Sequence, residues 1–509
     1  MDTTRGDAAG ETMVWGSPGA RWVLGATVGA SALALLDATT VNVALPAIGA
    51  DLDATFGGLQ WTVNAYTLVL AALILLSGSL ADRFGRRRVF VVGIAWFTLA
   101  SLLCAAAPTI GLLVAGRALQ GAGGALLTPG SLAILQASFA PGDRARAIGA
   151  WAGLGGIAAA VGPLLGGVLI GTLGWRAIFW INVPVTAAVL WATLRHVPGS
   201  RPTNVARRFD VAGSLLATVG LGVLTWALIT GGERGADPLL VTVGAVGVLA
   251  LALFVVVERR AAEPMMPLEL FTSRQFSGTN LVTFVVYGGM AGLFFLLVVH
   301  LQVVLGYPPL LAGSALLPVT LLMLVLSPRA GALAERLGPR RPMTAGPLVM
   351  ATGLVLIARL DAGSSYLVDL LPAIVVFGLG LSALVTPLTA TALAAAPDHR
   401  SGVASGINNA ISRTGGLLAV AALPPLAGIT GDAFNDPARF AAGFATAMHA
   451  SAGLIALGGV LALFTIRDQL PDGRTACPHS RTLGPRRCPV DGSPLQPDNG
   501  LVAAGSPSG

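Results

Sequence analysis

The 509-residue sequence contains no lysine, and only 11% of its residues are charged. An ordinary soluble domain carries about 25% charged residues, so this scarcity of charge excludes a soluble globular protein. All 31 basic residues are arginine and they outnumber the 24 acidic residues, a balance that also suits a nucleic-acid binder. The arginines lie in short breaks between apolar runs, however, and this placement argues against a nucleic-acid partner.

Cysteine and histidine are scarce too, with three and five copies. Cys104 lies in an apolar run, whereas Cys477 and Cys488 lie near the C-terminus, so we expect no disulfide framework. Together with His479, the two C-terminal cysteines lack a fourth ligand at metal-binding spacing, in a segment whose composition is typical of disorder. We therefore expect no metal and no cofactor. Since the sequence also lacks His-Glu-x-x-His and Gly-x-Ser-x-Gly motifs, we do not expect an enzyme.

Apolar residues are abundant and make up 54% of the chain. A membrane-spanning helix needs about 20 of them in succession. Fourteen such runs begin near residues 22, 59, 89, 110, 146, 177, 211, 238, 277, 310, 342, 369, 402 and 443. The sequence therefore predicts an all-α polytopic membrane protein with fourteen spans and with both termini on one side.

The arginines indicate which side that is. Twenty-five of the 31 fall in the termini or in loops on the same side as the termini, four fall on the other side, and Arg117 and Arg413 lie within spans. Because loops rich in arginine stay in the cytoplasm, we expect a multi-pass protein of the cell membrane, in contact with lipid, with both termini in the cytoplasm.

Two segments of the chain repeat. Residues 78–88 are similar to residues 331–341 at an offset of 253, and Thr128-Pro129 pairs with Thr386-Pro387 at an offset of 258. Such offsets predict two six-helix halves in parallel order, with two helices inserted between them. The predicted parts are a cytoplasmic segment (1–20), an N-terminal bundle (21–195), a linker with two helices (196–275), a C-terminal bundle (276–467) and a disordered cytoplasmic tail (468–509).

The loop after the second span resembles the GxLaDrxGrr signature of the major facilitator superfamily, through Gly78, Asp82, Arg83, Gly85, Arg86 and Arg87. Residues 36–46 resemble the first-helix motif of its fourteen-helix drug:proton antiporter branch, and residues 117–124 resemble the helix-4 motif. Residues 162–167, followed by 174–184, resemble the antiporter motif of that branch. The second loop departs from the signature, with Glu335 in place of the aspartate and Pro339 among the arginines, so we do not assign it the same role.

The resemblance implies a major facilitator fold of two six-helix bundles plus two extra helices. It also implies proton-coupled efflux of drugs, antibiotics or other amphiphilic small molecules by alternating access, driven by the proton gradient and carried out by a monomer. A proton-coupled nutrient or metabolite symporter of the same fold is the alternative.

Asp37 lies well inside the first span, where an aspartate costs roughly 2.5 to 3.5 kcal/mol. Burial favours its neutral form and wetting favours its charged form, so this residue suits a proton carrier. Arg117 enters the fourth span to within about 6 Å of the same depth. Our hypothesis is that Arg117 stabilises ionised Asp37 in one conformation and is displaced by substrate in the other. The alternative is a structural aspartate bonded to neighbouring helices.

Five polar residues within spans are candidates for a substrate cavity. Gln120 lies on the same helix face as Arg117, whereas Gln60 with Asn64 and Asn409 with Arg413 form pairs four residues apart. The alternative for these side chains is hydrogen bonding between helices.

Two further groups are candidates for conformational gating. Gly162, Pro163, Gly166 and Gly167 thin and bend the fifth helix, and the resemblance implies that they lie where the two halves meet; the alternative is simple glycine packing. By the same resemblance, Asp82 meets a helix end of the other half and latches the inner gate. Its neighbouring arginines alternatively anchor the loop on anionic lipid.

Overall fold

The computed structural model describes residues 13–199, 210–235, 237–397, 400–431 and 436–468, without the side chains of Asp82 and Ala145. These residues form helices joined by short loops, with no β-strand among them, which confirms the all-α fold class. Nearly all of the predicted tail, with Cys477, His479 and Cys488, lies outside the described residues, as do residues 1–12 of the N-terminal segment.

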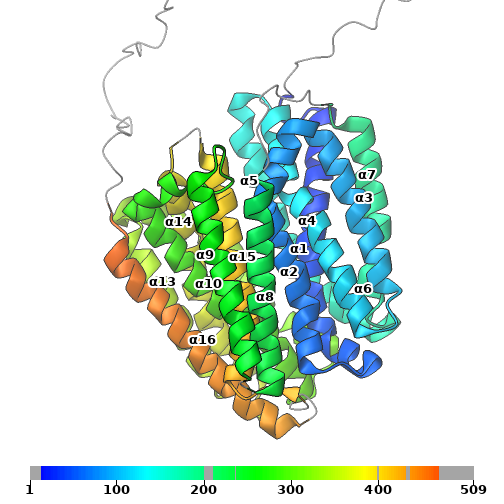
Figure 1. Cartoon of the computed structure of the whole chain (residues 1–509), viewed down its shortest axis with the longest axis vertical. Coiled ribbons are helices and arrows are strands. Elements are labelled where there is room, and N and C mark those ends of the chain that lie inside the picture. The colour runs from blue at the N-terminus through cyan, green and yellow to red at the C-terminus, as the bar shows by residue number, and fades with distance from the viewer. Residues whose placement is uncertain (1–12, 200–209, 236, 398–399, 432–435, 469–509) are drawn as a thin grey trace, which may run out of the picture. The chain divides into compact units, whose positions relative to one another are not determined.

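The first six predicted spans are drawn in blue to cyan-green in Figure 1. They are α1 (Pro18–Leu52), α2 (Phe56–Phe84), α3 (Arg86–Ala105), α4 (Ile110–Ser138), α5 (Pro141–Leu173) and a broken helix made of α6 (Ala177–Trp180) and α7 (Asn182–His196). Side-chain oxygens of Ser17, Thr55 and Thr109 accept backbone N–H groups at the starts of α1, α2 and α4. Gly85 separates α2 from α3 with a φ of 91°, a conformation that other residues rarely adopt.

The second half repeats this plan. It contains α10 (Arg274–Val303), α11 (Pro309–Ser314) with α12 (Leu317–Leu337), α13 (Arg340–Ile357), η2 (Tyr366–Leu370) with α14 (Leu371–Ala394), α15 (Ser401–Leu426) and α16 (Pro437–Thr465). Gly338, which separates α12 from α13, has a φ of 81°. In the first half Arg87 donates to the carbonyl of Leu194 on α7, and in the second Arg340 donates to the carbonyl of Leu463 on α16 at 2.8 Å. Each half therefore has the same connection from its signature-like loop to its last helix.

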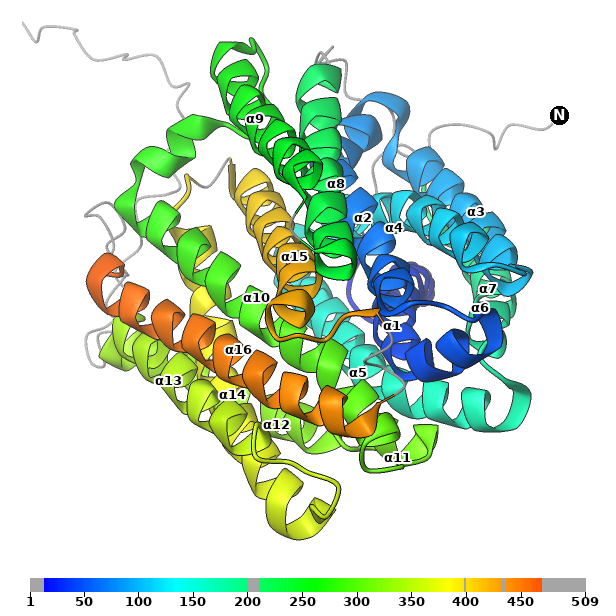
Figure 2. The ribbon, with the colours of Figure 1, turned by 60° about the horizontal axis from the view of Figure 1, so that its bottom comes forward.

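Two more helices lie between the halves in sequence. α8 (Val211–Arg234) and α9 (Pro238–Arg260) pack against each other, and the short η1 (Leu268–Thr272) leads to α10. α8 also packs on α2 and α15 (Figure 2), where Leu68, Leu221 and Leu417 form an apolar cluster. The inserted pair is thus attached to both halves through α8.

Within the described residues, twelve segments are long and apolar enough to cross a membrane. The two remaining predicted spans coincide with α13 and α15, which are helical but more polar. α13 begins with Arg340 and Arg341, and α15 carries Asn408, Asn409 and Arg413. The count of fourteen spans therefore stays a prediction.

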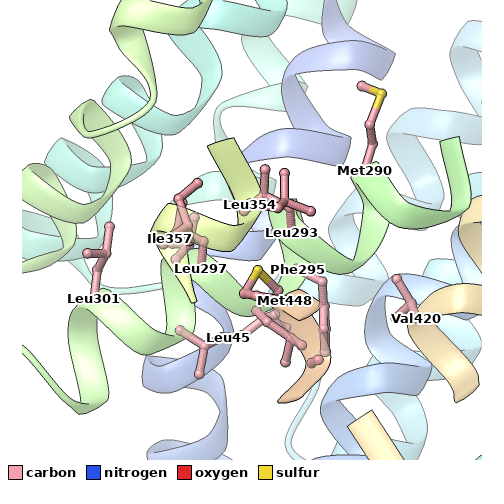
Figure 3. Packing of buried hydrophobic residues seen from close by; sticks show 14 of the residues in the cluster. Leu45, Met290, Leu293, Phe295, Leu297, Leu301, Leu354, Ile357, Val420 and Met448 are labelled. Carbon is pink, nitrogen blue, oxygen red and sulfur yellow. The ribbon is translucent and has the colours of Figure 1, made fainter. Parts of the chain in front are cut away.

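The halves are joined mainly at one end of the bundle. We call the end that holds the loops at Gly85 and Gly338 the arginine-rich end. At the opposite end the halves share one apolar core (Figure 3), in which Leu45 of α1 belongs to the same cluster as Leu297 of α10 and Met448 of α16. At the arginine-rich end each half has its own apolar cluster. A partly buried residue of the other half packs against each of these two clusters. The first-half members of this shared core all lie at the opposite end, so the halves are packed together there and we call it the closed end.

Candidate functional site

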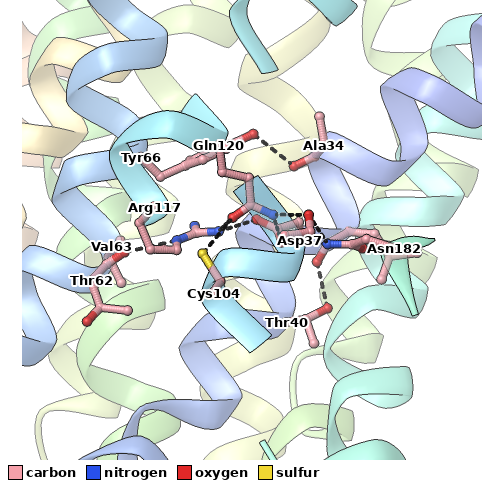
Figure 4. Close-up of polar contacts among 12 residues, drawn as sticks. Ala34, Asp37, Thr40, Thr62, Val63, Tyr66, Cys104, Arg117, Gln120 and Asn182 are labelled. Carbon is pink, nitrogen blue, oxygen red and sulfur yellow. Dashed lines mark hydrogen bonds and ion pairs between the residues drawn. The ribbon is translucent and has the colours of Figure 1, made fainter. Parts of the chain in front are cut away.

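Four helices of the first half bring buried polar side chains together around Asp37 (Figure 4). α1 contributes Asp37, α3 contributes Ser101, α4 contributes Arg117 and Gln120, and α7 contributes Asn182. Polar groups in the interior of a membrane protein are costly, so a cluster of this kind is a candidate functional site.

The Asp37 carboxylate accepts hydrogen bonds from three side chains. Its Oδ2 is paired with Nη1 of Arg117, and its Oδ1 accepts from Nε2 of Gln120 at 2.8 Å and from Nδ2 of Asn182 at 3.2 Å. Since a carboxylate that only accepts is an ionised one, the geometry is that of charged Asp37 paired with charged Arg117. Both side chains are only 1% exposed, so the pair is sealed from solvent.

Arg117 is held on every side. Its Nε donates to the carbonyl of Thr62 on α2 at 3.1 Å, and Nη1 also donates to Oε1 of Gln120 at 2.6 Å. The guanidinium lies 4.4 Å from the ring centroid of Tyr66 and 5.9 Å from that of Phe179, which are cation–π distances. The sequence placed Arg117 and Asp37 at similar depths, and the structure brings them into direct contact.

A second layer fixes the donors that hold Asp37. Oγ of Ser101 accepts from Gln120 at 2.9 Å and from Asn182 at 3.2 Å, and donates to the carbonyl of Phe97 at 2.8 Å. Asn182 reaches this point because the helix breaks between α6 and α7. Pro184 has no N–H for the carbonyl four residues earlier, and its ring crowds that carbonyl.

The sequence analysis did not predict Ser101 or Asn182 as site residues. Asn182 stands in the segment that resembles the antiporter motif, which was an available signal, but nothing in the sequence around Ser101 distinguishes it from an ordinary buried serine.

The other cavity candidates do not join this network. Nε2 of Gln60 donates to the carbonyl of Val420 on α15 at 2.6 Å, so this side chain links the two halves near the closed end. Asn64 is 1% exposed and neither of its amide atoms has a partner. Asn409 is exposed, and Arg413 is half-buried with its Nε unpartnered. Only Gln120 lies beside Asp37, and a cavity role for these residues stays a prediction.

The glycines of α5 lie between α1 and the second half. Gly162 and Gly166 face Thr39 and Thr40 of α1, and the hydroxyl of Thr40 donates to the carbonyl of Gly162 at 3.2 Å. Gly167 lies against the backbone of Leu310, and the carbonyl of Pro163 lies against Gly313, both on α11. The motif is therefore at an interface between the halves, and its role as a hinge stays a prediction.

The signature loop is tied to its own half. Nη1 of Arg86 donates to the carbonyl of Ala133 on α4 at 3.1 Å, while Arg87 reaches α7 as described above. Arg83 is exposed and lies 5.7 Å from the ring centroid of Phe84. A Cβ at Gly78 would meet no atom within 4 Å. Because the side chain of Asp82 lies outside the description, its role as a latch stays a prediction.

Comparison with known proteins assigns the fold to a family. Residues 27–420 match the profile of the Major Facilitator Superfamily. The chain belongs to this superfamily. Superfamily membership makes it an integral membrane transporter of small molecules, and the buried polar cluster around Asp37 lies within the matched region.

Relatives within the superfamily include exporters and resistance proteins. The puromycin resistance protein pur8 of Streptomyces alboniger is 40% identical over 79% of this chain and 80% of its own length. The tetracenomycin C resistance and export protein of Streptomyces glaucescens is 38% identical over 81% of this chain and 77% of its own length. The multidrug resistance protein Stp of Mycobacterium tuberculosis is 39% identical over 76% of this chain and 72% of its own length.

Solved superfamily structures share the fold. A peptide transporter POT in complex with sulfate superimposes with a TM-score of 0.65 at 16% identity, covering 88% of this chain and 94% of its own. A bacterial homologue of the human lysosomal transporter Spinster, in an inward-facing and unoccupied conformation, gives a TM-score of 0.60 at 18% identity, covering 88% of this chain and 97% of its own.

Proposed function

We propose that this chain exports drugs, antibiotics or other amphiphilic small molecules from the cell in exchange for protons. The observation that carries the proposal is the sealed Asp37–Arg117 pair, because an ionisable carboxylate in the interior of a transporter can load and release a proton. Relatives named for resistance and export support efflux as the direction of transport.

The described geometry corresponds to the step after Asp37 has released its proton. When Asp37 is protonated, it loses the charge that attracts Arg117. One of its carboxyl oxygens then carries a hydrogen, which faces the N–H donors of the neighbouring side chains instead of an acceptor. The links from α1 to α4 and α7 then weaken together. Proton binding and the tight pair are in this way mutually exclusive, so loading or releasing the proton changes how tightly α1 is held to α4 and α7.

The positive-inside rule supports a cytoplasmic position for the arginine-rich end and for both termini. The shared apolar core then closes the outer end, and this conformation faces the cytoplasm. In it, a proton that leaves Asp37 has moved inward along its gradient, and substrate binds next from the inside.

The proton gradient supplies sufficient free energy without a cofactor. One proton that crosses 100 mV contributes about 2.3 kcal/mol, and one pH unit adds about 1.4 kcal/mol. A neutral substrate exchanged for one proton is then concentrated several hundred-fold, by about 1.4 kcal/mol for each factor of ten. We propose that fourteen spans in a single chain perform this cycle, and that no partner subunit is required.

Inverted membrane vesicles test the proposal. A pH gradient is imposed, and its dissipation is followed while puromycin, other antibiotics and lipophilic dyes are added to wild type and to Asp37→Asn. Asp361→Asn is the matched control, since it makes the same chemical change in an exposed loop.

We expect substrate-dependent dissipation in wild type and in Asp361→Asn and none in Asp37→Asn. Dissipation that persists in Asp37→Asn would place the proton elsewhere. If no exporter substrate has any effect on wild type, nutrient symport becomes the leading explanation.

A further inference from the structure

A polar stripe follows one face of α15. Ser401, Ser405, Asn409 and Arg413 recur every four residues, and Ser412 adds a hydroxyl beside the last of them. The stripe starts at the arginine-rich end, which is the end where the halves have separate cores. Asn409 is exposed, whereas Arg413 is half-buried. The stripe therefore leads from the arginine-rich end of α15 to a half-buried arginine well within the helix.

Arg413 lacks a partner for that charge. No hydrogen bond or ion pair joins it to any residue that the structure describes, and its Nε is buried without an acceptor. Among the described residues, the titratable groups near enough to influence it are the hydroxyls of Tyr66 on α2 and Tyr287 on α10, which are neutral near pH 7 and cannot balance its charge. The N–H of Nε is thus an unsatisfied donor inside a membrane protein, which is costly, whereas the two terminal nitrogens are not fully buried and can reach a ligand.

The contrast with Arg117 is informative. Both arginines lie within helices, but Arg117 is paired with Asp37 and stacked on Tyr66, whereas no described residue is paired with Arg413. Arg413 lies twelve residues into α15, about 18 Å from its start, which is too deep for a lipid headgroup at the membrane surface. None of the described residues supplies a partner for this charge, which leaves a molecule that enters the bundle as the candidate.

A second unsatisfied group lies in the same region. α2 and α15 run antiparallel and touch at Gln60–Val420 and at Leu75–Gly406. Asn64 and Arg413 fall between these two contact points, one on each helix. Asn64 is only 1% exposed, and neither its amide nitrogen nor its amide oxygen has a hydrogen-bond partner among the described residues.

We propose that Arg413 binds an anionic group of the substrate, such as a carboxylate, sulfonate or phenolate, and that the substrates are organic anions. This inference rests on the proposed export function and narrows its substrate class. Arg117 is already neutralised by Asp37, whereas the charge of +1 on Arg413 is uncompensated by any described residue, and a monoanion would bring it to zero. Guanidinium groups favour such acceptors because they offer paired, parallel N–H donors.

An anionic substrate also changes the electrical balance of the cycle. One proton moving in and one anion moving out transfer two positive charges inward, whereas a neutral substrate transfers one and a monovalent cation none. At a fixed pH gradient, accumulation of an anion should therefore rise roughly a hundredfold for each 60 mV, compared with roughly tenfold for a neutral analogue.

The test uses two probes that differ in charge but not in their apolar part, naphthalene-1-sulfonate and naphthalene-1-sulfonamide. Their uptake into energised inverted vesicles is measured for wild type, Arg413→Gln and Arg413→Lys. Arg439→Gln is the matched control, because Arg439 is exposed at the start of α16. We expect Arg413→Gln to reduce sulfonate uptake at least tenfold, with sulfonamide uptake changed less than twofold. Arg413→Lys should retain part of the sulfonate uptake, and Arg439→Gln should resemble wild type.

Equal losses for both probes in Arg413→Gln would mean a structural role and would overturn the inference. Wild-type transport of sulfonamide or of cations such as ethidium, without sulfonate transport, would also overturn it while leaving the export function intact. If wild type moves no probe and no antibiotic, the export function itself fails. The voltage dependence of probe accumulation by the wild type tests the charge of the substrate separately. It does not require that any variant folds.

Discussion

Asp37 on α1 and Arg117 on α4 form a buried ion pair although 80 residues separate them in the sequence. α1 also packs on α5 and on α10, and Gln302 of α10 donates to the carbonyl of Val43 at 3.0 Å. The pair is therefore only a few residues along α1 from a contact with the second half. A change in its protonation can alter that interface directly.

The first prediction concerns Arg117→Ala. Removing one member of a buried pair costs about 3 to 5 kcal/mol, because the remaining charge is uncompensated. We therefore expect the thermal unfolding temperature of the purified protein to fall. The double variant Asp37→Asn/Arg117→Gln should recover most of the stability without recovering proton coupling. Intact coupling in Arg117→Ala would remove Arg117 from the mechanism.

The second prediction concerns Asn182→Ala. Asn182 donates to the ionised form of Asp37, and a hydrogen bond to a charged group contributes about 1.5 to 3 kcal/mol. Without this donor the buried ion pair loses one of its three hydrogen bonds, so proton-coupled transport should slow by roughly tenfold. Thr193→Val is a suitable control, since that buried hydroxyl bonds only within α7. A transport rate equal to that of wild type would mean that Asn182 has no influence on the proton site.

The third prediction compares two glycines one turn apart on α5. A Cβ at Gly167 would lie 2.5 Å from Cα of Leu310, whereas a Cβ at Gly171 would meet no atom within 4 Å. Gly167→Ala should therefore push α11 away and disfavour the conformation with the opposite end closed. We expect slower transport and faster labelling of cysteines introduced at that end, with Gly171→Ala close to wild type. Similar behaviour of the two variants would argue against a seam at Gly167.

The fourth prediction concerns the inserted helices. Glu258 of α9 and Asp210 at the start of α8 lie within reach of each other, and Oε1 of the first and Oδ2 of the second both lack a donor. Their other oxygens already accept from the backbone N–H groups of Met266 at 3.0 Å and Gly213 at 2.7 Å. Glu258→Gln supplies the missing donor, so it should stabilise the protein by about 1 kcal/mol at pH 8.

At pH 5 the effect of Glu258→Gln should vanish, because a shared proton then serves as the donor. Thermal unfolding at the two pH values measures this, with Glu335→Gln on the exposed side of α12 as the control. A stabilisation that is the same at both pH values would contradict a shared proton.

Several features of the site could be predicted from the sequence, and the reasons are local. An aspartate inside an apolar run is costly wherever the helix packs, so Asp37 is recognisable without a structure. The rise per residue of an α-helix places Arg117 at a depth in the membrane similar to that of Asp37. The partners that complete the network could not be predicted, because a buried serine such as Ser101 looks the same in sequence whether it bonds its own helix or a neighbour.

The length and order of the apolar runs determined that this chain is an all-helical membrane protein, because each helix satisfies its backbone hydrogen bonds within its own segment. The distribution of arginine among the loops predicted the orientation of those helices. This prediction is also local, because the charge of each loop acts on the helices next to it. The tertiary structure decided that Gln60 links α2 to Val420, 360 residues away, and that Gly167 meets α11. It also decided that Arg117 is paired with Asp37 while no described residue is paired with Arg413. Such relationships depend on which helix faces pack together, and helix packing is a property of the whole folded bundle that no single segment encodes.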